Sequence, residues 1–293
     1  MKRTTGKQEI CLYRYEPSFA ASAAFTLLFG GSVLLHLVQI WRKRTWFFVP
    51  FLIGGCFEIG GYVGRGISSK ESFPHYSLMP YLIQSVLLLL GPTLFAASIY
   101  MLLGRLIRLL DASQYSLIRI ERLTKYFVLG DVLSFLSQSA GGGLLASASS
   151  PSQQNLGNNI IIIGLGIQIT FFAFFMIVTC IFHYRIIHRP TTRSISLTVP
   201  WNQALLVLYV VGTLIMIRSA YRLAEYVMGT DGVLQSREIY LYIFDSCLMA
   251  SVVLLYNVFH PGKVLPNSKA IIGTVGYTDQ EAAYSLEYVH LES

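Results

Sequence analysis

The sequence predicts an all-α, polytopic membrane protein with seven transmembrane helices, its N-terminus outside and its C-terminus cytoplasmic. The first observation is composition: mean hydropathy is +0.55, 54% of the residues are hydrophobic and 13% are charged. Soluble globular chains carry about 25% charged residues. The second observation is a series of seven apolar stretches. The third is an unequal distribution of Lys and Arg between alternate connections.

The apolar stretches follow one another along a chain of 293 residues. Each is close to or longer than the ~20 residues that a membrane-spanning helix needs. We therefore expect one membrane domain at 17–262, preceded by an extracellular segment at 1–16 and followed by a short cytoplasmic tail at 263–293 that is predicted to be disordered. The expected spans are Pro17–Trp41, Trp46–Ile67, Pro80–Leu103, Leu123–Leu145, Leu156–Phe182, Trp201–Val227 and Ile239–His260.

Lys and Arg set the expected orientation, because the cytoplasmic connections of membrane proteins carry an excess of both. The first, third and fifth connections and the tail carry most of them, so this side is assigned to the cytoplasm. The basic N-terminal segment argues mildly for the opposite orientation. Attraction of loop arginines to anionic lipids explains the net charge of +7, and nucleic acid is not an expected partner. The residues on the basic side are Arg42, Lys43, Arg44, Arg105, Arg108, Arg119, Arg122, Lys125, Arg185, Arg189, Arg193, Lys263 and Lys269.

Three local signals modify this outline. Gly91–Pro92 lies inside the third expected span, where proline removes a backbone hydrogen bond and is expected to kink or locally open the helix. The stretch 146–159 is rich in Ser, Gln and Asn and is predicted to be a flexible outer loop. Pro261–Gly262 is expected to end the last helix.

Polar side chains form a stripe on each of four expected spans. Their spacing of three, four and seven positions puts the members of each set on one helix face. A charge at the centre of a membrane helix costs about 2.5–3.5 kcal/mol on insertion scales, so these groups need partners or a wet cavity. The stripes are Glu58, Tyr62 and Arg65 in the second span, Asp131, Ser134 and Gln138 in the fourth, Arg218, Arg222 and Glu225 in the sixth, and Glu238, Tyr242 and Asp245 in the seventh.

Five of these side chains are carboxylates and three are arginines. In the assigned topology most of them lie in the outer half of the membrane, which predicts an outward-opening polar cleft with Arg–carboxylate pairs between the second, sixth and seventh spans. Three interpretations are open. The pairs are static bridges that fix the bundle, or the arginines hold a phosphate or carboxylate headgroup, or the carboxylates receive an amine-bearing amphiphile or exchange protons. The excess of acidic groups favours the last slightly.

Several classes of activity are not expected. An intramembrane zinc hydrolase needs several histidines at membrane depth. The sequence has no H-E-x-x-H, G-x-S-x-G or P-loop motif. The four cysteines do not have the spacing of a metal site. No enzyme activity and no cofactor is therefore predicted, and any transport is expected to be passive, coupled to protons or dependent on another protein.

With the stripes identified, the chain resembles the fungal lipid-translocating exporter family, which includes the aminocholesterol-resistance and sphingoid-base-release proteins. Leu248 replaces a proline that is frequent in the family, and Gly91 replaces an alanine, which puts local helix geometry in doubt more than function. The resemblance implies a multi-pass plasma-membrane protein linked to sphingoid-base release and to resistance to toxic amphiphiles. It rests on Glu58 to Arg65, Pro92 to Tyr100, Gly130 to Asp131, Gln138 to Gly143, Gly164 to Gln168, Arg218 to Glu225, Glu238 to Asp245 and Phe259 to Gly262.

The first hypothesis for function is therefore a lipid or amphiphile translocator in the plasma membrane. In it Glu58, Glu225 and Asp245 attract a cationic amine, three arginines keep these carboxylates ionised, and a polar path continues inward. The alternative is a seven-span receptor, or a regulator of the lipid or stress response, without transport activity. The compound, the direction, the energy source and the oligomeric state stay open. The arginines are Arg65, Arg218 and Arg222, and the inward path consists of Asp131 and Gln138.

Overall fold

The computed structural model describes residues 16–71, 77–148, 150–197, 199–229, 234 and 237–265, and all regular secondary structure in these residues is helical. The all-α prediction is therefore confirmed for this part of the chain. The expected extracellular segment and cytoplasmic tail lie almost entirely outside the described residues, so both stay predictions.

Seven helical rods account for most of the described chain. The last rod is composite, because a π-helical segment separates its two α-helical parts. Short 3₁₀ turns lie at Trp46–Phe48, Ser113–Tyr115 and Pro261–Lys263. The helices are α1 (Phe19–Lys43), α2 (Val49–Ser68), α3 (Leu78–Leu109), α4 (Ile120–Ser147), α5 (Pro151–His188), the short α6 (Thr192–Ser196), α7 (Trp201–Val227), α9 (Glu238–Leu241), the π-helical segment Tyr242–Cys247 and α10 (Leu248–Val258).

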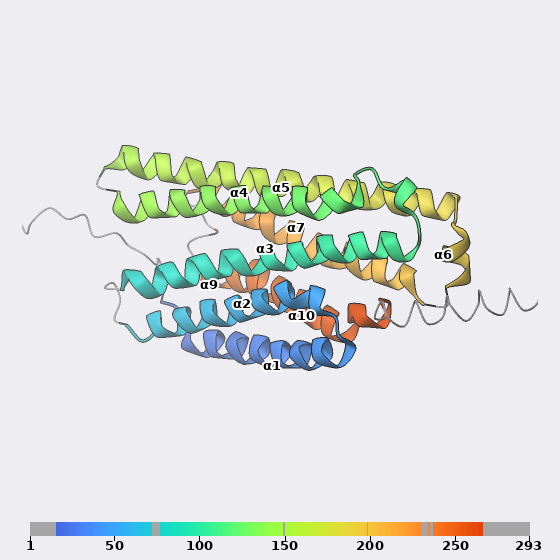
Figure 1. Ribbon diagram of the computed structural model, residues 1–293. Helices are drawn as coiled ribbons and strands as arrows, with labels where there is room; N and C mark the ends of the chain where they lie inside the picture. Colours follow the sequence, from blue (N-terminus) through green and yellow to red (C-terminus); the bar gives the residue numbers. More distant parts are fainter. Residues whose placement is uncertain are drawn as a thin grey trace, which may run out of the picture.

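The rods run alternately in opposite directions along a common axis (Figure 1). Helices α4 and α5 lie side by side at one edge, α1 and α2 lie at the other, and α3 packs against both α2 and α4. The C-terminal ends of α1, α3, α5 and α10 all lie at the same end of the bundle (Figure 1). The connections rich in Lys and Arg therefore gather at one end, as the sequence predicts, and their assignment to the cytoplasm stays a prediction.

Six helical segments of the described chain are long and apolar enough to cross a membrane: Phe19–Lys43, Trp46–Ser68, Met79–Leu109, Pro151–His188, Trp201–Val227 and Glu238–Lys263. Helix α4, which contains the expected fourth span, does not meet this criterion. Asp131, Gln138, several serines and three consecutive glycines lower its hydropathy, and its first turns carry charged residues. The described residues thus form seven helical rods, of which six have the composition of a membrane span.

The predicted flexible loop at 146–159 is wrong for the residues described. Helix α4 continues to Ser147, and α5 already begins at Pro151. Ser150 is the N-cap of α5 and its Oγ accepts a hydrogen bond from the backbone N–H of Gln153 at 3.4 Å. Serine at the N-cap followed by proline at the first helical position is a favoured helix start. The polar composition of the stretch therefore belongs to a helix end.

Small residues allow α4 and α5 to approach closely. A Cβ added to Gly141 would lie 2.6 Å from the carbonyl oxygen of Gly157, and one added to Gly157 would lie 2.9 Å from the carbonyl oxygen of Gly141. At Gly164 the added Cβ would lie 2.9 Å from the carbonyl oxygen of Ser134. Membrane helices commonly use such small residues to bring their backbones together. This contact holds the less apolar α4 against the strongly apolar α5.

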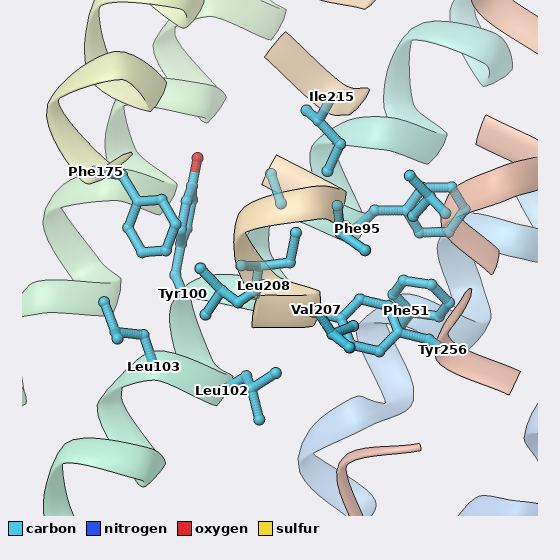
Figure 2. Packing of buried hydrophobic residues seen from close by; sticks show 14 of the residues in the cluster. Phe51, Phe95, Tyr100, Leu102, Leu103, Phe175, Val207, Leu208, Ile215 and Tyr256 are labelled. Atoms are coloured by element: carbon cyan, nitrogen blue, oxygen red, sulfur yellow. The ribbon is translucent and has the colours of Figure 1, made fainter. Parts of the chain in front are cut away.

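Aromatic and aliphatic side chains fill the centre of the bundle. Figure 2 shows Phe51, Phe95 and Tyr256 on one side of Leu208, and Tyr100 with Phe175 on the other. The ring centroids of Phe51 and Phe95 are 4.5 Å apart, and those of Tyr100 and Phe175 are 4.6 Å apart. Offset and edge-to-face ring pairs of this kind add stability beyond burial alone. The core thus links α2, α3, α5, α7 and α10.

The outer surface is largely apolar, as expected for a bundle surrounded by lipid. Leu27, Leu34 and Ile163 are among many large aliphatic side chains that are more than half exposed. Trp41 and Trp46 are exposed on either side of the connection between α1 and α2, beside basic residues. Tryptophan is enriched at the boundary between membrane and water. This surface supports a multi-pass membrane protein.

The glycine contact between α4 and α5 predicts unequal effects of two neighbouring substitutions. Gly141→Ala is expected to lower the free energy of unfolding by about 1–3 kcal/mol, because its new Cβ meets a backbone oxygen that is not free to move. Gly142→Ala is the matched control, since its Cβ meets nothing within 4 Å. Thermal unfolding of the purified variants in detergent measures the difference, and equal midpoints would contradict the close approach.

Candidate functional site

The sixth and seventh expected spans are joined by a buried ion pair. The guanidinium of Arg218 on α7 donates through Nε to Oδ1 of Asp245, which lies in the π-helical segment. Nη2 of Arg218 donates to the backbone carbonyl oxygen of Leu88 on α3 at 2.6 Å. One arginine therefore holds three helical rods together.

Pro92 explains why the Leu88 carbonyl is available. In an α-helix this oxygen would accept from the N–H group four residues later. That residue is Pro92, which has no N–H. Helix α3 nevertheless runs without interruption from Leu78 to Leu109. The local opening of this helix that the sequence predicts is therefore limited to one missing backbone hydrogen bond. Arg218 donates to the Leu88 carbonyl oxygen in its place.

Glu58 of α2 is buried and lies beside this ion pair. Its carboxylate interacts electrostatically with Asp245 and Arg218. A Cβ added to Gly91 would lie 2.6 Å from Oε1 of Glu58, so the glycine makes room for the carboxylate. Among the described residues Oε1 has no hydrogen-bond partner. One turn along α2, the hydroxyl of Tyr62 donates to Oγ of Ser246 at 2.5 Å.

A second cluster joins α1 and α2 to the start of the last rod. Nη2 of Arg65 lies 2.7 Å from Oε1 of Glu238, and Nε of Arg65 donates to the Tyr242 hydroxyl at 3.1 Å. That hydroxyl donates in turn to Oε1 of Glu238 at 2.9 Å. The backbone N–H of Ser18, the N-cap of α1, donates to the same oxygen at 2.9 Å. The predicted Arg–carboxylate pairs between the second, sixth and seventh spans are thus present.

Arg222 and Glu225 pair differently, because both lie on α7. Nη1 of Arg222 is 2.7 Å from Oε2 of Glu225. The guanidinium carbon also lies 5.6 Å from the ring centroid of Tyr226, an arrangement that stabilises a cation through the face of the ring. The ion pair itself lies within one helix and does not join α7 to another rod. Both side chains also interact electrostatically with Asp245 on the last rod.

Asp131 and Gln138 lie apart from these groups because they belong to α4, and Figure 1 shows α3 between α4 and α2. Asp131 is buried and interacts electrostatically with Tyr100 of α3. Nε2 of Gln138 donates to Oγ of Ser134 at 2.5 Å and to Oε1 of Gln168 at 3.4 Å. These two predicted site residues are therefore brought to the contacts of α4 with α3 and α5.

The charged groups are enclosed to different degrees. Arg65 is 0% exposed, and Glu58, Arg218 and Asp245 are each 2% exposed. The side chains of Glu238, Glu225 and Arg222 are 17%, 12% and 11% exposed. In the described residues these seven side chains, called the charged cluster below, therefore form a closed group with a partly exposed rim. An outward-opening cleft stays a prediction.

Several contributing groups were not among the residues predicted from sequence. Ser246 follows Asp245 directly, but only the π-helical turn shows that both face inward, since both are buried. The Leu88 carbonyl is signalled by Pro92 four residues later. The role of Gly91 is visible only in the structure, where the glycine leaves room for the Glu58 carboxylate. Tyr100 is a polar group within an apolar stretch, which is a weak signal in a chain rich in tyrosine.

Comparison with known proteins gives consistent matches over most of the chain. A model of the family described as RTA1 like protein matches residues 51–268. The chain is 36% identical over 275 residues to Protein RTA1 of Saccharomyces cerevisiae, covering 85% of this chain and 84% of that protein. It is 38% identical over 282 residues to Protoporphyrin uptake protein 1 of the same species, covering 84% and 91%.

A further relative is the Sphingoid long-chain base transporter RSB1 of Saccharomyces cerevisiae. The chain is 27% identical to it over 299 residues, covering 90% of this chain and 77% of that protein. No solved structure matches the chain. Of these relatives, one is thus named as an uptake protein and one as a transporter.

The Arg218–Asp245 pair predicts strongly coupled effects on stability. Asp245→Ala is expected to lower the free energy of unfolding by about 3–5 kcal/mol, because it leaves a buried guanidinium without its carboxylate. Replacing both members, with Arg218→Met and Asp245→Leu, is expected to cost less than Asp245→Ala alone. Thermal unfolding in detergent is measured for Asp245→Ala, for the single variants Arg218→Met and Asp245→Leu, and for the double variant. A double variant that loses the sum of the losses of Arg218→Met and Asp245→Leu would argue against a direct pair.

Proposed function

The chain belongs to the RTA1 like protein family, and on this premise we propose that it moves an amphiphilic lipid across the plasma membrane. The proposed substrate class is sphingoid long-chain bases or toxic amphiphiles that carry an amine. The relative named as a sphingoid long-chain base transporter supports this class. The expected partners are the substrate and the surrounding bilayer.

The observation that carries the proposal is the environment of Glu58. Its carboxylate is buried beside the Arg218–Asp245 pair, and Oε1 has no hydrogen-bond partner in the described part of the chain. A buried polar atom without a partner is costly, and an ammonium group would supply the missing donor. Acidic groups also exceed basic ones in the cluster, so a cation restores balance better than an anion does.

A graded exposure supports a route to this position. The partly exposed Glu238 and Glu225 form the rim, and Asp245 and Glu58 lie deeper. An amine would meet the rim carboxylates first and then exchange them for the deeper ones, while its chain stays in lipid. The intervening π-helical segment Tyr242–Cys247 is a suitable place for the required opening, because such segments are frequent at functional sites.

Each predicted site residue has a role in this mechanism. Glu58, Glu225 and Asp245 attract the amine, with Glu238 at the entrance. The arginines pair with the carboxylates and offset their negative charge, and the tyrosines act as hydrogen-bonding neighbours. A polar path then continues inward on α4. The arginines are Arg65, Arg218 and Arg222, the tyrosines are Tyr62 and Tyr242, and the inward path consists of Asp131 and Gln138.

The topology proposed for this mechanism has seven spans, with the N-terminus outside and the C-terminus in the cytoplasm. It adds α4 to the six apolar segments as a span that is shielded by α3 and α5. The clustering of basic connections at one end of the bundle supports the orientation. This places the rim of the cluster in the outer half of the membrane.

A second candidate function is a receptor or regulator without transport activity. The closed state of the cluster favours it, because buried Arg–carboxylate pairs that never open would serve only to fix the bundle. The basic connection between α3 and α4 is a suitable site for a cytoplasmic partner. The two functions differ in whether the purified protein alone moves lipid.

Reconstitution tests the proposal directly. Purified protein in liposomes is expected to accelerate transbilayer movement of a fluorescent sphingoid base, and Asp245→Asn and Glu225→Gln are expected to reduce the rate about tenfold or more. Glu121→Gln is the matched control, because this carboxylate is exposed in the first turn of α4. Each variant is first shown to be folded by its helical signal and its elution as a single species.

Two results would contradict the translocator. Folded wild-type protein that gives no movement above empty liposomes would favour the receptor or regulator. Folded variants that all retain the wild-type rate would remove the charged cluster from the mechanism.

Chemical labelling of introduced cysteines tests the topology. Ser113 and Ser152 are both exposed, and they lie before the N-terminal end and after the C-terminal end of α4. Ser113→Cys and Ser152→Cys therefore report whether α4 crosses the membrane. In a variant without native cysteines, an impermeant maleimide applied to intact cells is expected to label Ser152→Cys only. In inside-out vesicles the pattern is expected to reverse. Labelling of both positions from one side would refute α4 as a span.

A further inference from the structure

A hollow lies at the C-terminal end of α5, at the end of the bundle that carries the basic connections. None of the residues of the charged cluster lines it. Its volume is about 650 Å³, and it lies between the 3₁₀ turn that follows α3 and the last turns of α5. Nη1 of Arg185 donates to the backbone carbonyl oxygen of Tyr115 at 3.2 Å and so ties this turn to α5. The lining residues are Gln114, Tyr115, Tyr184, Arg185, His188 and Arg189.

The lining has the chemistry of an anion site. Arg185 and Arg189 bring two guanidinium groups, His188 brings an imidazole, and none of the six lining residues is a carboxylate. Arginine matches the planar spacing of phosphate oxygens with two parallel N–H groups. The C-terminus of α5 also favours cations through the helix dipole, but this effect does not account for a hollow of headgroup size.

An apolar stripe leads away from the hollow along α5. Phe174, Ile177 and Tyr184 are 43%, 53% and 65% exposed on the outer surface. With His188 they recur at intervals of three, seven and four positions, which puts all four on one helix face. The ring centroids of Tyr184 and His188 are 4.1 Å apart, so the stripe reaches the hollow itself. A ligand with a charged head and an apolar chain would contact both surfaces.

We propose that this hollow binds the phosphate headgroup of an anionic membrane phospholipid, with the acyl chain lying along the exposed face of α5. The site differs from the charged cluster in location, since it lies at the end of the bundle that carries the basic connections. It also differs in sign, because the cluster is matched to an amine and the hollow to a phosphate. The inference is therefore independent of the translocation proposed above. A bound lipid here would tie α5 to the turn between α3 and α4.

Binding of labelled lipids to the full-length protein in detergent tests the site. Fluorescent phosphatidic acid is expected to bind at least about tenfold more tightly than phosphatidylcholine with the same label and chains. The combined variant Arg185→Gln with Arg189→Gln is expected to lose this preference. Arg42→Gln with Arg119→Gln is the matched control, because it removes two exposed positive charges from the same end without touching the hollow. A large excess of inorganic phosphate is expected to leave the lipid bound.

The single variant Arg189→Gln is measured as well, since Arg185 also anchors the Tyr115 turn. If the combined variant does not fold, a weakened preference in Arg189→Gln still supports the site. Equal binding of the two lipids to the wild type would overturn the proposal. Equal losses in the control would attribute binding to general charge and also overturn it. Release of the lipid by inorganic phosphate would identify a site for a soluble phosphate compound and refute a lipid site.

Discussion

The last helical rod is held in the bundle by two ion pairs, Arg65–Glu238 and Arg218–Asp245, and the arrangement of the other polar groups follows from them. An unpaired charge at this depth is costly, so each arginine requires its carboxylate on the neighbouring rod. Arg218 also needs a second acceptor, which Pro92 provides by leaving the Leu88 carbonyl free. The π-helical turn lies where these contacts meet, and both of its buried residues, Asp245 and Ser246, bond to other helices.

Much of the fold is predictable from sequence because membrane burial imposes a strong pattern. The order of the helical rods and the gathering of basic connections at one end follow from apolar length and from Lys and Arg counts. Helix ends are less predictable: Ser150–Pro151 is a clear start signal, yet the polar residues after it suggest a loop. The sequence predicts that the buried arginines pair with carboxylates, but not which carboxylate each arginine takes. Arg222 bonds to Glu225 on its own helix while Arg218 bonds across helices, and both choices are compatible with the same stripe.

The closed cluster and the proposed transport are compatible if the last rod opens during the cycle. The pairs at the rim are partly exposed, so water or an amine headgroup reaches them at lower cost than it reaches Asp245. Glu58 is then positioned to accept the amine, because its unpaired oxygen lies beside the Arg218–Asp245 pair that must separate. The hollow at the end of α5 has the opposite preference for charge. One chain would thus bind a cationic amphiphile as substrate and an anionic phospholipid as a fixed neighbour.

Cross-linking with a photoactivatable sphingoid base, whose reactive group lies next to the amine, shows whether the charged cluster holds the headgroup. The purified protein is irradiated with the probe, and the labelled peptides are identified by mass spectrometry. Labels are expected in Val49–Ser68 and in Glu238–Val258, and they are expected to disappear when excess unlabelled sphingoid base is present. Labels confined to the lipid-exposed faces, unchanged by the competitor, would contradict a headgroup site in the charged cluster.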